Sequence, residues 1–329
     1  MKYYREIDIL RGMAIIMVIV GHSIIVYPID LMQVLWCNVL FQMVTVTHMP
    51  LFFMIAGFCF HRGGTFAELI KKKAKRLLIP YVVFNSGDML CRALFSRLVN
   101  RPRSLRESLI NMFFYGGEYW FLYVLFILCV IFALIINVVE RFQWLQILLL
   151  IVAIAMNQWS AFGMNQIGRF DLVCKYFVFC YIGFLIKNYR ESCGRWREKI
   201  DNVWCRSFVI IVWIVLYYRY YQTMEKNHVF LLLLVNCAGA LVCLMLAWRI
   251  SDLGIGRWLK EVGRYSLQLY LLNGYFLVIS RTMIVQVLGI TMPLLIVAGN
   301  AFVSVCVAIL FIKQVLFRIP GMKYLCGEA

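Results

Sequence analysis

Residues 118–139 read EYWFLYVLFILCVIFALIINVV, a stretch in which Glu118 is followed by an uncharged run of mostly apolar side chains. A helix of about 20 apolar residues crosses the hydrocarbon core of a bilayer, so this stretch predicts a membrane-spanning helix. The whole chain agrees, since 63% of its 329 residues are hydrophobic and 15% are charged, against about 45–50% and about 25% in soluble domains. This composition excludes a solvated globule, a disordered chain and a soluble nucleic-acid binder.

Similar apolar runs recur along the sequence and predict an all-α, polytopic integral membrane protein with about ten transmembrane helices. No segment between them is long enough to fold separately, so we expect a single transmembrane domain over residues 1–329. Lys2 and Arg5 precede the first run without a small-residue cleavage site, so we expect that run to be retained. The expected spans are 7–28, 46–60 (after an amphipathic segment at 31–45), 77–96, 118–139, 144–160, 170–187, 203–218, 228–248, 265–286 and 292–316.

The net charge of +17 follows the expected membrane topology. With the N-terminus in the cytoplasm, 23 of the 33 Lys and Arg residues fall on the inner side and 10 on the outer side. Both termini are therefore expected inside, in a multi-pass protein of the inner (plasma) membrane. One outer segment, 97–117, does not fit this pattern because it carries four arginines. It is either an interfacial segment on acidic headgroups or a groove for an anionic acceptor. The four are Arg97, Arg101, Arg103 and Arg106.

The twelve cysteines and four histidines do not form a metal or disulfide pattern. Most cysteines fall inside apolar runs, and there is no C-x-x-C pair. The histidines, at 22, 48, 61 and 228, lack the spacing of a zinc site. We therefore expect no metal cofactor and no disulfide framework.

The first span contains the strongest candidate site, RGMAIIMVIVGH, which begins at Arg11 and ends at His22. Eleven residues on an α-helix make about three turns, so both side chains share one face about 16 Å apart. Asp8, three residues before Arg11, can pair with it across the turn. A neutral histidine in this position can act as a general base on a hydroxyl group, and the arginine can hold an anionic cofactor arm. The alternative for His22 is a core histidine bonded to a neighbouring helix.

A basic cluster at 62–76 lies on the expected inner side, with only Glu68 opposing six positive residues. Such a cluster binds anionic ligands, because arginine grips phosphate bidentately and lysine adds point charge. The alternative is that the cluster only sets the topology of the chain.

Three more residues stand near the expected outer ends of spans. Glu118 could orient or charge-balance the imidazole of His22, or simply favour a helix N-terminus. Trp120 could stack on a sugar ring or belong to an interfacial aromatic belt. His48 either lines the site beside His22 or is a helix-start histidine. Other polar residues inside expected spans are candidates for lining a cavity: Asn85, Asp88, Lys175 and Asn236.

Several separated motifs together resemble one known family, the membrane acyltransferase-3 group. They cover most of the chain, from an Asp/Arg-Gly…Gly-His opening to a late Gly-x-Tyr-Ser run that leads to Tyr-Leu. Two positions depart from the family pattern, since Ala56 replaces a common serine and Asn273 replaces a common histidine. The short chain is most similar to the fucose 4-O-acetylase-like branch. The matching residues are Asp8, Arg11, Gly12, Gly21, His22, Thr47, His48, Met49, Pro50, Leu51, Phe52, Phe53, Gly57, Phe58, Lys73, Arg76, Ile79, Pro80, Tyr81, Gly263, Tyr265, Ser266, Tyr270 and Leu271.

The resemblance implies an integral membrane O-acyltransferase that moves an acyl group, most commonly acetyl, from coenzyme A to a hydroxyl of a surface sugar or polysaccharide. It implies that His22 is the essential histidine, as general base or acyl carrier, and that Arg11 is its companion. Lys73 and Arg76 match the family's inner-loop basic motif and would hold coenzyme A. Asn273 can still orient a hydroxyl.

The expected partners are acyl-coenzyme A, a surface glycan or lipid-linked sugar acceptor, and membrane lipid, with no nucleic acid. Two rival functions remain from the sequence. One is an exporter of polysaccharide or lipid-linked sugar without acyl transfer, although no internal repeat is evident. The other is a membrane receptor or assembly scaffold, which would not need Arg11 and His22 in register.

Overall fold

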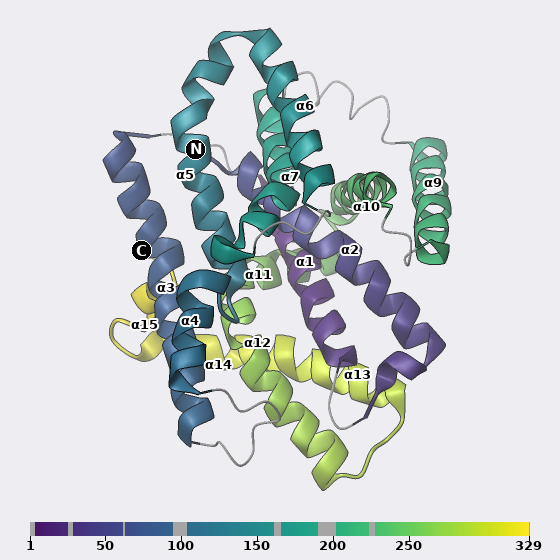
Figure 1. The fold of residues 1–329 in the computed structure, drawn as a ribbon. Helices are drawn as coiled ribbons and strands as arrows, with labels where there is room; N and C mark the ends of the chain where they lie inside the picture. Colours follow the sequence, from purple (N-terminus) through teal and green to yellow (C-terminus); the bar gives the residue numbers. More distant parts are fainter. Residues whose placement is uncertain are drawn as a thin grey trace. The chain divides into compact units, whose positions relative to one another are not determined.

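The structure is a computed structural model that describes residues 4–25, 29–61, 63–94, 104–160, 166–189, 202–223 and 228–328. Within these ranges every regular element is a helix, which confirms the all-α prediction (Figure 1). The elements are α1 (Arg5–Ile24), η1 (Leu31–Gln33), α2 (Leu35–Phe58), α3 (Phe66–Leu94), α4 (Leu105–Tyr115), α5 (Trp120–Arg141), α6 (Gln143–Trp159), η3 (Ile167–Arg169), α7 (Phe170–Asn188), α9 (Val203–Gln222), α10 (Val229–Ile250), α11 (Gly254–Arg264), α12 (Ser266–Arg281), η5 (Thr282–Val287), α13 (Pro293–Phe302), η6 (Val303–Val307), α14 (Ala308–Gln314), η7 (Leu316–Arg318) and α15 (Met322–Leu325).

Each of the ten expected spans overlaps a helix of the described chain, with different bounds, and seven of its helical segments are long and apolar enough to cross a membrane. The other three expected spans correspond to α3, α6 and α7. Helix α6 is short, whereas α3 and α7 carry charged residues within their length. The seven segments are Arg5–Ile24, Leu35–Phe58, Leu105–Arg141, Val203–Gln222, Val229–Ile250, Ser266–Val287 and Pro293–Arg318.

The expected division between an amphipathic segment at 31–45 and a span at 46–60 is wrong. Helix α2 is continuous from Leu35 to Phe58 and contains Pro50. A proline removes one backbone N–H group, but membrane helices tolerate this where neighbouring groups satisfy the freed carbonyl. The consequence is that His48 lies well inside a helix rather than at its start.

The expected outer segment 97–117 contains a helix, α4, that begins with a capping box. The Oγ of Ser104 accepts a hydrogen bond from the N–H of Glu107 (3.2 Å), and the Glu107 carboxylate accepts one from the N–H of Ser104 (2.9 Å). Arg106 is exposed in the first turn of this helix. The other three arginines of the segment, Arg97, Arg101 and Arg103, lie outside the described residues.

The chain forms two compact units, which we describe separately. The first unit consists of Met1–Ile55 and Leu185–Arg318, and it includes α1, most of α2 and the helices from α9 to α14. The second unit consists of Ala56–Phe184 and Ile319–Ala329, and it includes α3 to α6, most of α7, and α15.

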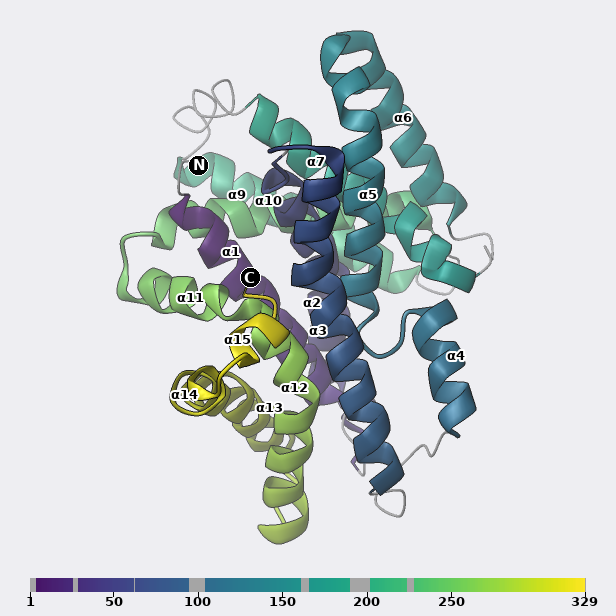
Figure 2. The ribbon, with the colours of Figure 1, turned by 90° about the vertical axis from the view of Figure 1, so that its left-hand side faces the viewer.

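In the first unit, α1 and α11 pack backbone against backbone through two glycines (Figure 2). A Cβ atom on Gly12 would lie 2.1 Å from the carbonyl oxygen of Leu259. A Cβ atom on Gly263 would lie 1.8 Å from the carbonyl oxygen of Asp8. Because real Cβ contacts stay above 3.0 Å, only glycine permits this approach at either position. The contact holds the Asp8–Arg11 end of α1 against α11.

Apolar side chains fill the rest of the first unit. Ile24 of α1, Cys37 of α2 and Ile296 of α13 are fully buried in one cluster. A second cluster joins α2, α9 and α10, where the Tyr217 hydroxyl donates a hydrogen bond to the backbone carbonyl of Val39 (2.8 Å). These contacts hold α2 between α1 and the α9–α10 pair.

In the second unit, α3 runs alongside α5 (Figure 2), and aromatic side chains build its core. Phe132 is fully buried, and its ring centroid lies 5.4 Å from that of Phe177 and 5.7 Å from that of Phe60. Tilted aromatic pairs at this separation are favourable beyond the area they bury. A Cβ atom on Gly57 would lie 1.8 Å from the carbonyl oxygen of Cys180, so the end of α2 also meets α7 through a glycine.

Candidate active site

His22 lies in the last turn of α1, where its side chain is exposed. Its ring nitrogen Nδ1 lies 2.8 Å from the backbone carbonyl oxygen of Val18, one turn earlier. A carbonyl oxygen only accepts hydrogen bonds, so Nδ1 carries the proton and donates it. In the neutral imidazole, Nε2 is then the nitrogen that can accept a proton. The helix itself therefore selects the tautomer that a general base needs.

Arg11 lies eleven residues before His22 on the same unbroken helix, which preserves the expected spacing of about 16 Å. Its Nη1 lies 3.0 Å from Oδ1 of Asp8, so the expected pair across one turn is confirmed. The two side chains are 28% and 10% exposed, respectively. The carboxylate offsets the guanidinium charge near the start of a spanning helix, which lowers the cost of keeping it there.

His48 is buried within α2 and lies close enough to His22 to interact with it electrostatically. Its Nδ1 donates a hydrogen bond to the carbonyl of Val44 (2.6 Å), which repeats the geometry of His22 on the neighbouring helix. A Cβ atom on Gly21 would lie 3.3 Å from Cγ2 of Val44, so α1 and α2 meet at this level. The structure therefore brings His48 beside His22.

Asn273 is a buried residue of α12 in the same unit. Its side-chain oxygen Oδ1 is buried and has no hydrogen-bond partner among the described residues. A buried amide oxygen without a partner is costly, so it is available to a ligand hydroxyl or a water molecule. The role of Asn273 in orienting a hydroxyl group stays a prediction.

Lys73 and Arg76 lie on α3 in the second unit, near the start of that helix. The Lys73 ammonium lies 5.6 Å from the ring centroid of Phe60, and both basic side chains act electrostatically on Cys129 of α5. Glu68, which is the acidic residue of this region, closes a capping box: its carboxylate accepts from the Thr65 N–H (2.8 Å). The carboxylate of Glu68 is therefore bound at the start of α3, and the lysines and arginine that follow it on this helix form a basic surface. Arg62 lies outside the described residues.

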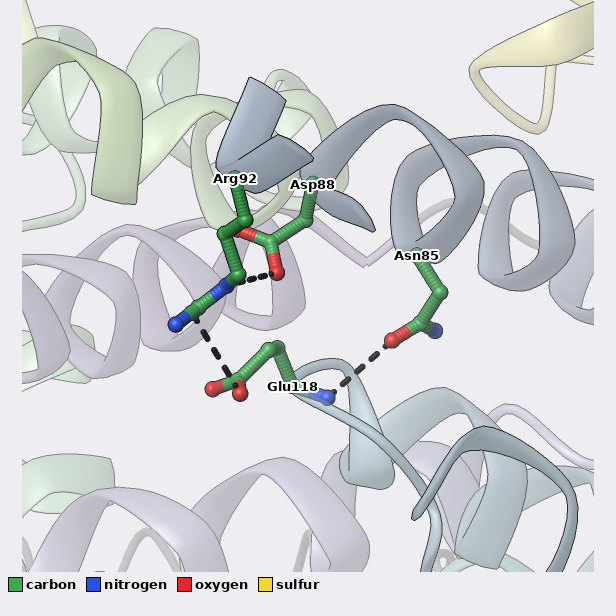
Figure 3. Close-up of polar contacts among 4 residues, drawn as sticks. All are labelled: Asn85, Asp88, Arg92 and Glu118. Carbon is green, nitrogen blue, oxygen red and sulfur yellow. Dashed lines mark hydrogen bonds and ion pairs between the residues drawn. The ribbon is translucent and has the colours of Figure 1, made fainter. Parts of the chain in front are cut away.

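Glu118 lies in the second unit, in the short connection between α4 and α5 (Figure 3). Its carboxylate lies 3.4 Å from Nη2 of Arg92, whose Nε donates a hydrogen bond to Asp88 (2.6 Å). The Glu118 backbone N–H donates to Oδ1 of Asn85 (3.1 Å). The sequence singled out Asn85 and Asp88 but missed Arg92 as the partner of Glu118. The positions 85, 88 and 92, spaced three and four residues apart on one helix face, are the signal that could have found it.

Trp120 begins α5, and its ring is stacked on that of Tyr176. The ring centroids are 5.9 Å apart and the planes differ by 19°. One face of the indole is thus already covered by the protein. The other face and the ring edge are the parts that a sugar could contact, because the side chain is partly exposed.

Comparisons with known proteins show the family of this chain. The sequence matches a family described as an acyltransferase domain over residues 4–313. It is also 24% identical over 293 residues to the nodulation protein NolL of Mesorhizobium japonicum, covering 81% of this chain and 74% of that protein. No solved structure matches the chain.

The helical architecture and these matches together define a membrane-embedded acyltransferase. The chain belongs to the acyltransferase-3 family, since the family match covers nearly its whole length. This confirms the resemblance that the separated motifs gave.

Proposed function

We propose that this membrane acyltransferase moves an acyl group, most simply acetyl, from acyl-coenzyme A to a hydroxyl group of a cell-surface sugar or polysaccharide. The observation that carries the proposal is the geometry of His22. Its Nδ1–H is bound to the Val18 carbonyl, so Nε2 is the ring nitrogen that can accept a proton. A histidine held in this tautomer is suited to general-base catalysis.

In the proposed reaction, Nε2 of His22 takes the proton from the acceptor hydroxyl as the hydroxyl oxygen attacks the thioester carbonyl. The new C–O bond forms, the C–S bond breaks, and the coenzyme A thiolate takes the proton back from the imidazolium. An alternative route forms an acyl-histidine first, because histidine can also act as a nucleophile. Neither route requires a metal ion.

The donor is proposed to bind through its phosphates to Lys73 and Arg76 at the cytoplasmic side. Arg11 would contact the polar arm of the donor, which extends toward His22 over the 16 Å or so that separate the two residues. Coenzyme A carries several negative charges, which the basic surface at the start of α3 can balance. The acidic residue of this region, Glu68, is bound in the helix cap with Thr65.

The acceptor is proposed to meet His48 and Asn273 of the first unit. Support comes from the proximity of His48 to His22 and from the unpartnered Oδ1 of Asn273. The contact of Trp120 with a sugar ring stays a prediction. The role expected for Glu118, orienting the imidazole of His22, stays a prediction, because the carboxylate is paired with Arg92 in the structure. We assign the enzyme to the inner membrane as a multi-pass protein.

The proposal is tested by mass analysis of surface glycan from the source organism with and without this protein. We expect acetyl groups on the glycan only when the protein is present. Purified protein in lipid nanodiscs should also transfer radiolabel from acetyl-coenzyme A to glycan extracted from the strain without it. A glycan with identical acyl content in both strains, together with no transfer in nanodiscs, would contradict the proposed function.

A further inference from the structure

Helix α11 connects two candidate membrane spans and is itself too short to cross a membrane. The span Val229–Ile250 ends four residues before α11 begins, and the span Ser266–Val287 begins two residues after α11 ends. The 11 residues of α11 extend over about 16 Å, against about 30 Å for the hydrocarbon core. A Cβ atom on Gly256 would lie 1.9 Å from the carbonyl oxygen of Ile250, so α11 folds back against the end of the preceding span. Both flanking spans therefore have an end beside α11.

The start of α1 lies at the same place. Gly263 of α11 meets the backbone of Asp8, as described above. Arg5 is the first residue of the span Arg5–Ile24, and its Nη1 lies 3.7 Å from Oδ1 of Asp252 in the connection between α10 and α11. Ends of three spans, those of α1, α10 and α12, therefore meet at α11 (Figure 2). Since a span ends where the membrane meets water, α11 lies at that boundary, on the side that the sequence predicts to be cytoplasmic.

A row of basic side chains runs along the surface of α11. Arg257, Lys260 and Arg264 are spaced three and four residues apart, so they follow one helix face over about 10 Å. Arg257 and Arg264 are exposed, whereas the residues that α11 turns toward the protein are buried. The row is thus available to a ligand outside the helix bundle. The buried residues of α11 are Gly256, Leu259, Val262 and Gly263.

Apolar side chains are exposed beside this row. Leu253, Ile255 and Trp258 are 48%, 55% and 40% exposed. An exposed tryptophan at a membrane boundary is typical of the interfacial region, where its ring lies at the level of the headgroups. Helices that combine exposed apolar residues with arginine and lysine lie in the plane of the interface and bind anionic lipid. A soluble anion would account for the basic row but not for the exposed apolar residues.

The carboxylates around α11 do not cancel the charge of the row. The described residues 5–11 and 249–264 carry four acidic side chains, and three of them lie in ion pairs with basic residues outside the row. The fourth, Glu6, balances at most one of the three charges of the row. Residues 190–201, which lie outside the described residues, carry four basic and three acidic side chains, so they add no net negative charge. The three pairs are Arg5–Asp252, Arg11–Asp8 and Lys313–Glu261.

We propose that α11 is an interfacial helix whose basic row binds the phosphates of anionic phospholipids. Arg257 and Arg264 contact the headgroups, because a guanidinium holds two phosphate oxygens at once. Ile255 and Trp258 contact the apolar part of the same lipid layer. Gly263 of this helix meets Asp8, so the bound lipid also stabilises the contact at the start of α1. The inference goes beyond the proposed function, because lipid binding requires no acyl transfer.

The test measures lipid binding to the purified full-length protein in detergent by native mass spectrometry. The probes are phosphatidylglycerol, which is negatively charged, and phosphatidylcholine, which has no net charge. We expect phosphatidylglycerol to bind more tightly. Arg257→Gln and Arg264→Gln should each weaken its binding about fivefold, the effect of one basic residue at an anionic membrane surface. The matched control is Arg219→Gln, which changes an exposed arginine at the opposite end of the α9–α10 pair from α11 and should leave the affinity unchanged.

Several results would overturn the inference. One is equal affinity of the unaltered protein for the two lipids, and another is a loss of phosphatidylglycerol affinity in Arg219→Gln as large as in Arg257→Gln. Unchanged phosphatidylglycerol affinity in Arg257→Gln and Arg264→Gln also overturns it, and weaker coenzyme A binding by calorimetry in these variants would then assign the row to the donor. If the glutamine variants do not fold, the melting temperature of the unaltered protein decides. Phosphatidylglycerol should raise it more than phosphatidylcholine does, because a ligand of the folded state stabilises that state, and equal melting temperatures overturn the inference.

Discussion

Replacing Gly263 by alanine should damage activity without removing any functional group. The new Cβ would lie 1.8 Å from the carbonyl oxygen of Asp8, and contacts below 3.0 Å do not occur in real proteins. Helices α1 and α11 must therefore separate by at least the 1.2 Å between these two values. Overpacking of this kind costs about 1–3 kcal/mol. The shift acts directly on Asp8, whose carboxylate holds Arg11 at 3.0 Å.

We expect Gly263→Ala to lower acyl transfer on the order of 100-fold, since a displacement of about 1 Å can cost that much. The measurements are radiolabel transfer from acetyl-coenzyme A in nanodiscs and the melting temperature in detergent. The matched control is Gly274→Ala, a glycine inside α12 at which a Cβ atom would meet nothing within 4 Å. Gly274→Ala should keep full activity and gain up to about 1 kcal/mol of stability from helix propensity. If Gly263→Ala and Gly274→Ala transfer acyl groups equally well, the claim that the approach of Gly263 to Asp8 is needed for activity is contradicted.

Two further predictions address the donor surface and the α4–α5 connection. Lys73→Gln and Arg76→Gln should each weaken coenzyme A binding about tenfold, measured by calorimetry, because each removes a charged phosphate contact. The control is Lys72→Gln, at an exposed position. Equal losses of affinity in all three variants would show that the total positive charge of the surface, and not contacts of Lys73 and Arg76, binds coenzyme A. Gly117→Ala should lower the melting temperature more than Gly289→Ala. Both glycines have positive φ (58° and 65°), but of the two only Gly117 approaches another group, Asn85. Equal shifts in melting temperature would show that the backbone conformation, and not the approach to Asn85, causes the loss of stability.

Local patterns in the sequence predicted the parts of the site that lie on one helix. The register of Arg11 and His22 follows from helix geometry alone, and the Asp8–Arg11 pair follows from three-residue spacing. The tautomer of His22 did not follow, because it depends on a bond to the carbonyl of Val18. A hydrogen bond from a side chain to the backbone of its own helix cannot be predicted from the pattern of residues.

Contacts between segments that are distant along the chain could not be predicted from the sequence. Arg92 was read only as an outer positive charge, and its bridge to Glu118 needs residues 26 positions apart to meet. Gly263 was noticed as part of a motif, but its approach to Asp8 depends on how α11 packs on α1. The continuity of α2 was missed because the expected boundary between an amphipathic segment and a span fell at residues 45 and 46, whereas the helix runs unbroken from Leu35 to Phe58.

The most direct test of the central claim is acyl transfer by a His22→Ala variant of the purified protein. The account predicts that this variant binds coenzyme A as the unaltered protein does and transfers no acetyl group to glycan. His228→Ala, a change at the start of α10 to which no chemistry is assigned, should transfer normally. Full transfer by His22→Ala would contradict the account.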